Sequence, residues 1–170
     1  MSEQTAQTDF HIRPATEADV PLILEFIREL AQYERLLHEV VATPESLRET
    51  LFGAWPYAEV SLCYLADAPA AFALYFHNYS TFLGRPGIYL EDLYVKEEFR
   101  GRGLGRALLR HLARLALERG CGRLEWAVLN WNEPAINFYK ALGAVPMDEW
   151  TVFRVTGDAL DRLGNADANG

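Results

Sequence analysis

The chain has 170 residues, of which 50% are apolar, so it is long and apolar enough to bury the core of one domain. Its formal net charge of −8 argues against a nucleic-acid partner, since binding a phosphate backbone needs clustered cations, and it favours a cationic substrate. The N-terminus lacks a basic region followed by an apolar run, and no stretch is apolar enough to span a bilayer, which predicts a cytoplasmic protein with no membrane contact. The four histidines lack metal-ligand spacing, so no metal is predicted.

The hydrophobic pattern predicts a single α/β domain at 10–163, with a mixed central sheet flanked by helices and with frayed ends at 1–9 and 164–170. A short strand around Ile12 precedes a helix that begins after the N-cap Thr16 and ends near Tyr33. The later elements are a helix at 44–52, strands at 59–66, 71–77 and 88–95, a helix from 104 to about 119, a strand at 123–129, a helix at 133–142 and a last strand at 149–155.

Three alternating glycines, Gly101, Gly103 and Gly105, lie between the strand at 88–95 and the following helix. Glycine accepts a positive φ and lets a ligand approach the main chain, so successive backbone N–H groups can point at one anion. The helix aims its unpaired N-terminal N–H groups and the positive end of its dipole at the same place. This pattern predicts a phosphate-binding loop, with Arg102 and Arg106 near enough to meet the phosphates.

Other interpretations of the glycine loop remain open from the residues alone. In a dinucleotide-binding loop the third glycine comes one residue later than Gly105, although Glu125 lies where a ribose-binding acid would be expected. A nucleotide P-loop is excluded, because the chain has no Gly-Lys-Ser/Thr sequence. A tight turn without a ligand is the plainest alternative, but it does not require three glycines.

Two motifs resemble the GNAT family (GCN5-related N-acetyltransferases). They are Arg100-x-x-Gly103-x-Gly105, which is similar to the family's acyl-CoA pyrophosphate loop, and Asn132-Glu-Pro-Ala-Ile-Asn-Phe-Tyr-Lys-Ala-Leu-Gly143, which is similar to its later motif. The opening at 12–19 is also typical of the family. Within it the chain most resembles the diamine (spermidine/spermine) N-acetyltransferases, through segments at 29–34, 89–92 and 131–134.

The resemblance implies acetyl-CoA as acetyl donor, no metal, and a homodimer. It implies a sheet strand that splays from its neighbour at the acetyl-CoA site and bonds the pantetheine arm through its main chain. Tyr139 resembles the family's general acid to the CoA sulfur, whereas helical periodicity alone suggests an aromatic packed beside Phe138. The implied cofactor-binding residues are Leu93, Tyr94, Val95, Arg100, Gly101, Arg102, Gly103, Leu104, Gly105, Arg106, Asn132, Glu133, Pro134 and Ala135.

The implied acceptor site contains Tyr33, Glu34, Glu91 and Asp92. Adjacent residues of an ideal strand point to opposite faces, so Glu91 and Asp92 share a pocket only if a bulge or the splay intervenes. The resemblance predicts a small primary amine as substrate, a polyamine or diamine first and a lysine-like amino acid or peptide amine as the alternative. Glu91 is expected to orient the amine or to act through a water. A non-catalytic CoA-binding regulatory module is the alternative of another class.

Overall fold

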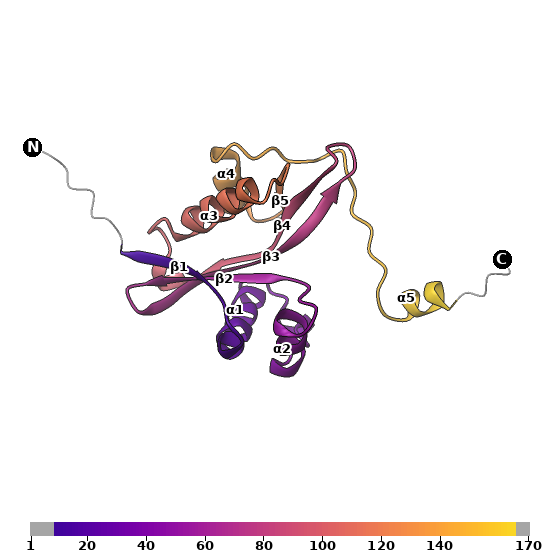
Figure 1. Cartoon of the computed structure of the whole chain (residues 1–170), viewed down its shortest axis with the longest axis horizontal. Helices are drawn as coiled ribbons and strands as arrows, with labels where there is room; N and C mark the ends of the chain where they lie inside the picture. Colours follow the sequence, from indigo (N-terminus) through magenta and orange to yellow (C-terminus); the bar gives the residue numbers. More distant parts are fainter. Residues whose placement is uncertain (1–8, 166–170) are drawn as a thin grey trace, which may run out of the picture. The chain divides into compact units, whose positions relative to one another are not determined.

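The computed structural model describes residues 9–165, which divide into one unit ending at Ala127 and a second unit starting at Val128 (Figure 1). The first unit contains a five-stranded sheet in the order β1-β2-β3-β4-β5, in which the first three pairings are antiparallel and β4 pairs with β5 in parallel. The predicted mixed α/β fold is therefore confirmed. The strands are β1 Phe10–Pro14, β2 Glu59–Leu65, β3 Ala68–Ser80, β4 Arg85–Val95 and β5 Leu124–Trp126.

Helices cover both faces of this sheet (Figure 1). Helices α1 (Val20–Tyr33) and α2 (Pro44–Phe52) lie on one face, and α3 (Leu104–Glu118) lies on the other. Short 3₁₀ turns, η1 at Glu17–Asp19, η2 at Leu37–Glu39 and η3 at Glu97–Phe99, precede α1, follow it and precede the glycine loop. All three helices begin where the sequence predicts, apart from the 3₁₀ turn that separates Thr16 from α1.

The start of α1 is fixed by hydrogen bonds that satisfy otherwise unpaired groups. Thr16 and Asp19 form the predicted capping box, with the Thr16 amide donating to Asp19 Oδ2 at 2.7 Å. The Arg13 guanidinium on β1 adds two bonds of 2.8 Å to the same carboxylate. Together these donors hold the pKa of Asp19 well below its usual range and tie the helix to the sheet.

The main core lies between the sheet and helices α1 and α2. Phe26 of α1 stacks on Phe72 of β3 with ring centroids 5.0 Å apart, and both side chains are fully buried. Tyr94 of β4 meets the Phe26 ring edge-on at 6.4 Å. Each such side chain contributes about 1.5–3 kcal/mol when it leaves water, so this packing fixes the face of β4 that looks toward α1.

The second unit contains α4 (Glu133–Ala141) and α5 (Gly157–Gly164). The predicted helix at 133–142 is confirmed, and Gly143 follows it with a φ of +90°. The predicted strand at 149–155 is wrong, because this segment has no regular secondary structure. Its β-branched and aromatic residues, among them Trp150, Val152 and Phe153, favour a strand, but a strand needs a partner for its backbone, and none pairs with it among residues 9–165.

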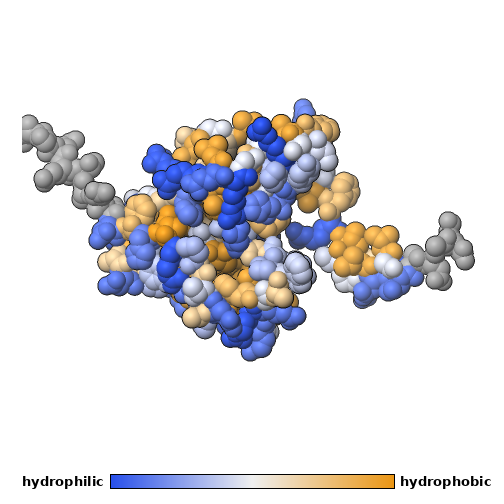
Figure 2. Space-filling model, in the orientation of Figure 1, coloured by the Kyte–Doolittle hydropathy of each residue, from blue (hydrophilic) through white to orange (hydrophobic). Residues whose placement is uncertain are grey.

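The predicted element boundaries differ from the structure at two further places. Strand β5 covers only Leu124–Trp126, whereas the sequence suggests 123–129. Helix α5 contains the last residues of the predicted domain, and the sequence pattern predicts no helix there. The predicted frayed ends fall mostly outside the described residues. Figure 2 shows apolar surface on α5, where Leu160 and Leu163 are exposed. Across the described residues, no helix is both long and apolar enough to cross a membrane.

Candidate active site

The glycine loop joins η3 to the first turn of α3. Gly101 and Gly103 have φ values of +75° and +81°, in the left-handed region that side chains strain. A Cβ at either position would meet no atom within 4 Å, so glycine is required by the backbone conformation and not by crowding. Gly105 differs, since it has no positive φ. The turn therefore leaves open space beside the unpaired N–H groups at the start of α3, as an anion site needs.

Arginine side chains hold this loop against its surroundings. Arg100 donates from Nε to the carbonyl oxygen of Val95 at 3.0 Å. Its guanidinium lies over the rings of Tyr33 and Tyr94, 4.9 and 5.5 Å from their centroids. Arg100 thus connects the glycine loop to Tyr33, a residue predicted for the acceptor site. A single sequence gives no signal for this contact.

The other two cations at the loop, Arg102 and Arg106, are exposed to solvent. Arg102 is exposed and lies 5.8 Å from the Phe99 ring centroid. Arg106 is exposed in the first turn of α3. Both charges are therefore available near the helix N-terminus, where phosphate oxygens would also meet backbone amides.

Strands β4 and β5 pair along only part of their length. Their parallel register runs from Ile88 with Leu124 to Leu90 with Trp126 and ends there. On its other side β4 stays paired with β3 as far as Val95. The main chain at 93–95 thus lies past the last β4–β5 pair, which matches the predicted splay.

A β-bulge in β4 lies at the two predicted acceptor carboxylates, Glu91 and Asp92. Leu90 pairs with Tyr75 and Asp92 pairs with Leu74, so Glu91 is an extra residue without a partner. The bulge reverses the alternation of side chains between the two faces of the sheet. Asp92 therefore faces the same side as Leu74 and Tyr94, both of which pack against the α1 core. Without it, Asp92 would face α3 together with Leu90. The structure therefore supplies the bulge that the sequence analysis required.

The bulge brings Asp92 toward the end of α1, where Glu34 follows Tyr33. Burial, and then the charges of Glu91 and Glu34, raise the pKa of Asp92 to about 6. Burial also raises the pKa of Glu34. Glu34, Glu91 and Asp92 thus form one electrostatically coupled group, here called the acidic cluster. Because like charges crowd there, an alkylammonium ion would be stabilised at this position.

Other predicted site residues lie in the second unit. Asn132 is the N-cap of α4, and its Oδ1 accepts a bond from the Ala135 amide at 3.4 Å. Glu133 and Pro134 form the first turn of the helix. Tyr139 lies on α4 with its ring 5.4 Å from that of Phe138. The roles proposed for these residues stay predictions.

Glu125, the acid that a dinucleotide-binding loop would use, already has two protein partners. Its Oε1 accepts a bond from Asn78 Nδ2 at 2.9 Å and lies 2.8 Å from Arg123 Nε. These contacts join β3 to β5 and argue against a ribose-binding role. Within residues 9–165, no group of three or more His, Cys, Asp or Glu side chains is placed to hold a metal ion.

The glycine loop at the start of α3, the end of β4 beyond its pairing with β5 and the acidic cluster all belong to one mixed α/β unit. The acetyltransferase (GNAT) family model matches residues 25–144, and the chain belongs to this family. It is accordingly an N-acetyltransferase, which argues against the regulatory module, and enzymes of the family use acetyl-CoA.

Several known proteins resemble most of the chain. A thialysine N-epsilon-acetyltransferase of Bos taurus is 42% identical, with 89% of this chain and 95% of that protein covered. An L-ornithine N5-acetyltransferase of Arabidopsis thaliana is 34% identical, with coverages of 89% and 86%. A spermidine/spermine N(1)-acetyltransferase-like protein of Homo sapiens is 31% identical over 92% of this chain and 24% of its own length. Among solved structures, a Vibrio cholerae integron cassette protein superposes with a TM-score of 0.78 at 26% identity, covering 92% of this chain and 98% of its own.

Proposed function

We propose that the protein transfers the acetyl group of acetyl-CoA to the primary amine of a small cationic acceptor, such as a diamine, a polyamine or a lysine-like amino acid. The acidic cluster of Glu34, Glu91 and Asp92 carries this proposal, because an alkylammonium ion is its natural partner. The names of the relatives support it, since thialysine, ornithine and spermidine each end in a primary alkylamine.

The glycine loop and the splayed part of β4 fit an acyl-CoA molecule, which supplies an activated thioester. Backbone N–H groups of the loop and of the first turn of α3 would bind its pyrophosphate, with Arg102 and Arg106 adding charge. The main chain at 93–95 would bond the pantetheine arm, and a backbone N–H there would polarise the thioester carbonyl. The segment 132–135 would complete this site.

The acceptor must lose a proton before it can attack. An alkylamine with a pKa of about 10.4 is neutral in only about one molecule in 2,500 at pH 7. A neighbouring carboxylate stabilises the ammonium form, so the cluster binds and orients the acceptor. Glu91, at the exposed bulge, acts through a water molecule that takes the proton from the amine. In this scheme the Tyr139 hydroxyl protonates the leaving sulfur.

A lysine-like acceptor is a second candidate within the same chemistry. It is favoured by the identity to the thialysine enzyme, which is higher than the identity to the spermidine/spermine-like protein. The acidic cluster fits both acceptors, because each presents an ammonium group on a flexible alkyl chain.

Donor binding gives the first test. CoA and acetyl-CoA should each raise the melting temperature through one site per chain, because a ligand selective for the native state stabilises it. NAD should leave the melting temperature unchanged. A thermal-shift series in which NAD stabilises the protein and acetyl-CoA does not would contradict the assignment of the loop.

Acceptor choice gives the second test. Release of CoA thiol should be measured with putrescine, spermidine, thialysine, lysine and ornithine, and with an uncharged amine as the comparison. Cationic acceptors should react much faster, and Glu91→Gln should raise their KM more than it weakens acetyl-CoA binding. Equal rates with charged and neutral amines would overturn the role of the acidic cluster while leaving acetyl transfer intact.

The assembly and location complete the proposal. We propose a homodimer, by analogy with the family, and a cytoplasmic location. Light scattering of the purified chain tests the first, and fractionation of cells tests the second.

A further inference from the structure

A cavity of about 290 Å³ lies where β2 begins, and it shares no residue with the glycine loop or the acidic cluster. Its walls come from the end of α2, the segment leading into β2, and the C-terminal half of α3. Most of the wall is apolar. The lining residues that matter below are Leu51, Phe52, Ser61, Tyr75, His111 and Leu115.

Three polar groups meet in this apolar surrounding. Ser61 Oγ lies 3.2 Å from His111 Nε2 and 3.4 Å from the Tyr75 hydroxyl. Ser61 and Tyr75 are 1% and 4% exposed, so their hydroxyl groups are shielded from bulk water. A hydroxyl group has one donor and two acceptor positions, and these two contacts leave capacity for another bond at each hydroxyl. A buried polar cluster of this kind orients a ligand that enters from an apolar side.

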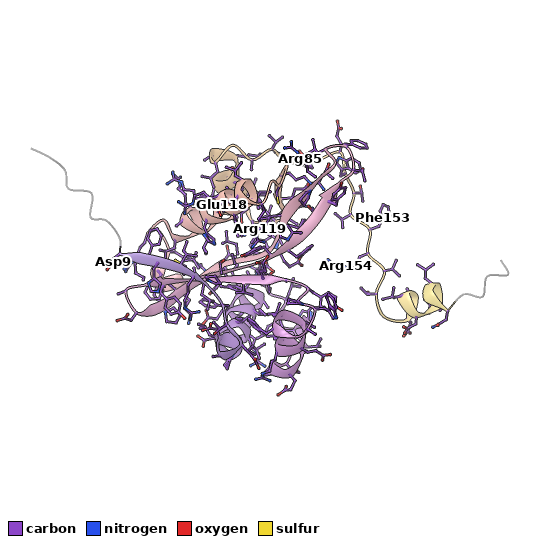
Figure 3. All side chains as sticks on the ribbon, viewed as in Figure 1. Asp9, Arg85, Glu118, Arg119, Phe153 and Arg154 are labelled. Atoms are coloured by element: carbon purple, nitrogen blue, oxygen red, sulfur yellow. The ribbon has the colours of Figure 1, made fainter. Side chains whose placement is uncertain are left out.

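The charges around the cavity are already matched. Arg119, labelled in Figure 3, follows α3 and binds the Glu59 carboxylate through Nη1 and Nη2, with Nη2 donating to Oε1 at 2.8 Å. Burial, and then the charge of Arg114, lower the pKa of His111, which keeps its ring neutral at pH 7. A charged ligand would therefore lose its hydration and find no free counter-ion.

We propose that this cavity is a second binding site, separate from the acetyl-transfer site, for a small neutral molecule with an apolar body and one hydroxyl or carbonyl group. The volume suits a single ring or a branched alkyl group. The apolar part packs between Phe52 and Leu115, and the polar group bonds to the Ser61 and Tyr75 hydroxyls. The proposal does not rest on acetyl transfer.

Three matched probes test it: benzyl alcohol, benzoate and toluene. Each is titrated into the full chain while the His111 ring signal is followed by ¹H–¹³C NMR. Benzyl alcohol should give a saturable shift with a Kd on the order of 1 mM, as expected of so small a ligand. Toluene should bind more weakly because it lacks the hydroxyl, and benzoate should not bind because its charge stays unpaired. Absence of saturation by benzyl alcohol, or equal binding of benzoate, overturns the proposal.

Variants locate the site. Leu115→Trp fills the cavity and should abolish binding of benzyl alcohol, whereas Leu117→Trp on the exposed side of the same helix should retain it. Circular dichroism shows whether each variant is folded. If Leu115→Trp does not fold, Ser61→Ala decides, with an expected loss of about threefold to tenfold in affinity from one hydrogen bond. Unchanged affinity in a folded Leu115→Trp, or in Ser61→Ala, contradicts the proposed site.

Discussion

Replacing Tyr139 with phenylalanine is expected to abolish most turnover while leaving the fold and the affinity for acetyl-CoA intact. Only the phenolic proton is lost, and the ring can still pack beside Phe138. A general acid contributes about 10²–10⁴ in rate, or roughly 3–5 kcal/mol of barrier. The measurement is kcat with a good acceptor, under conditions where chemistry limits the rate, together with the melting temperature.

If Tyr139 has only a structural role, the opposite effects on melting temperature and kcat are expected. The melting temperature would fall as a hydrogen bond is lost, and kcat per folded molecule would stay the same. Tyr79→Phe is a suitable control, because Tyr79 is 60% exposed on the β3–β4 hairpin. A loss of kcat below about threefold in Tyr139→Phe, far short of the general-acid range, would mean that water or the acceptor's own proton reaches the thiolate.

Asp92→Asn is expected to make the protein more stable and less active. The folded-state pKa of Asp92 is raised to about 6, above the 3.8 of an unperturbed aspartate. Between these two values the folded state binds more protons than the unfolded one, so stability falls as the pH rises and the full cost is present above pH 6. Removing the carboxyl charge should therefore raise the free energy of unfolding at pH 7 by about 1–3 kcal/mol.

The same substitution should weaken the acceptor interaction. A hydrogen bond to a charged group is worth about 1.5–3 kcal/mol, so kcat/KM for a cationic acceptor should fall about 10- to 100-fold. Urea titrations at pH 4 and pH 7 measure the stability, and steady-state kinetics measure the activity. Asp67→Asn, in the exposed turn between β2 and β3, is the matched control. If Asp92→Asn is no more stable than the parent at pH 7, the charged Asp92 carboxylate does not destabilise the folded state.

The sequence predicts most of this fold because its signals are local. The Thr16 capping box, Pro44 at the start of α2 and the glycines around α3 each mark an element boundary through backbone chemistry. The predicted strand at 149–155 fails because strand formation depends on a partner elsewhere in the chain, and alternation of side chains does not supply one.

Only the part of the candidate site that depends on local sequence can be predicted from the sequence. The glycine loop is contiguous, so its place between a strand and a helix can be predicted from the spacing of its residues. The approach of Asp92 to Glu34 depends on pairing between β3 and β4, and a bulge at Glu91 cannot be located from one strand. The contact of Arg100 with Tyr33 joins segments that are distant in the chain, and no local pattern indicates it.

The bulge at Glu91 lets β4 carry one residue more than a regular ladder with β3 would hold. If Glu91 itself paired with Leu74, every side chain from Asp92 to Val95 would project from the opposite face of the sheet. Tyr94 would then leave Phe26, and the Asp92 carboxylate would leave Glu34. Deleting Glu91 would instead restore a regular ladder with Asp92 still opposite Leu74, so this deletion, like point substitutions at 91, is expected to fold and to keep Asp92 on the α1 face.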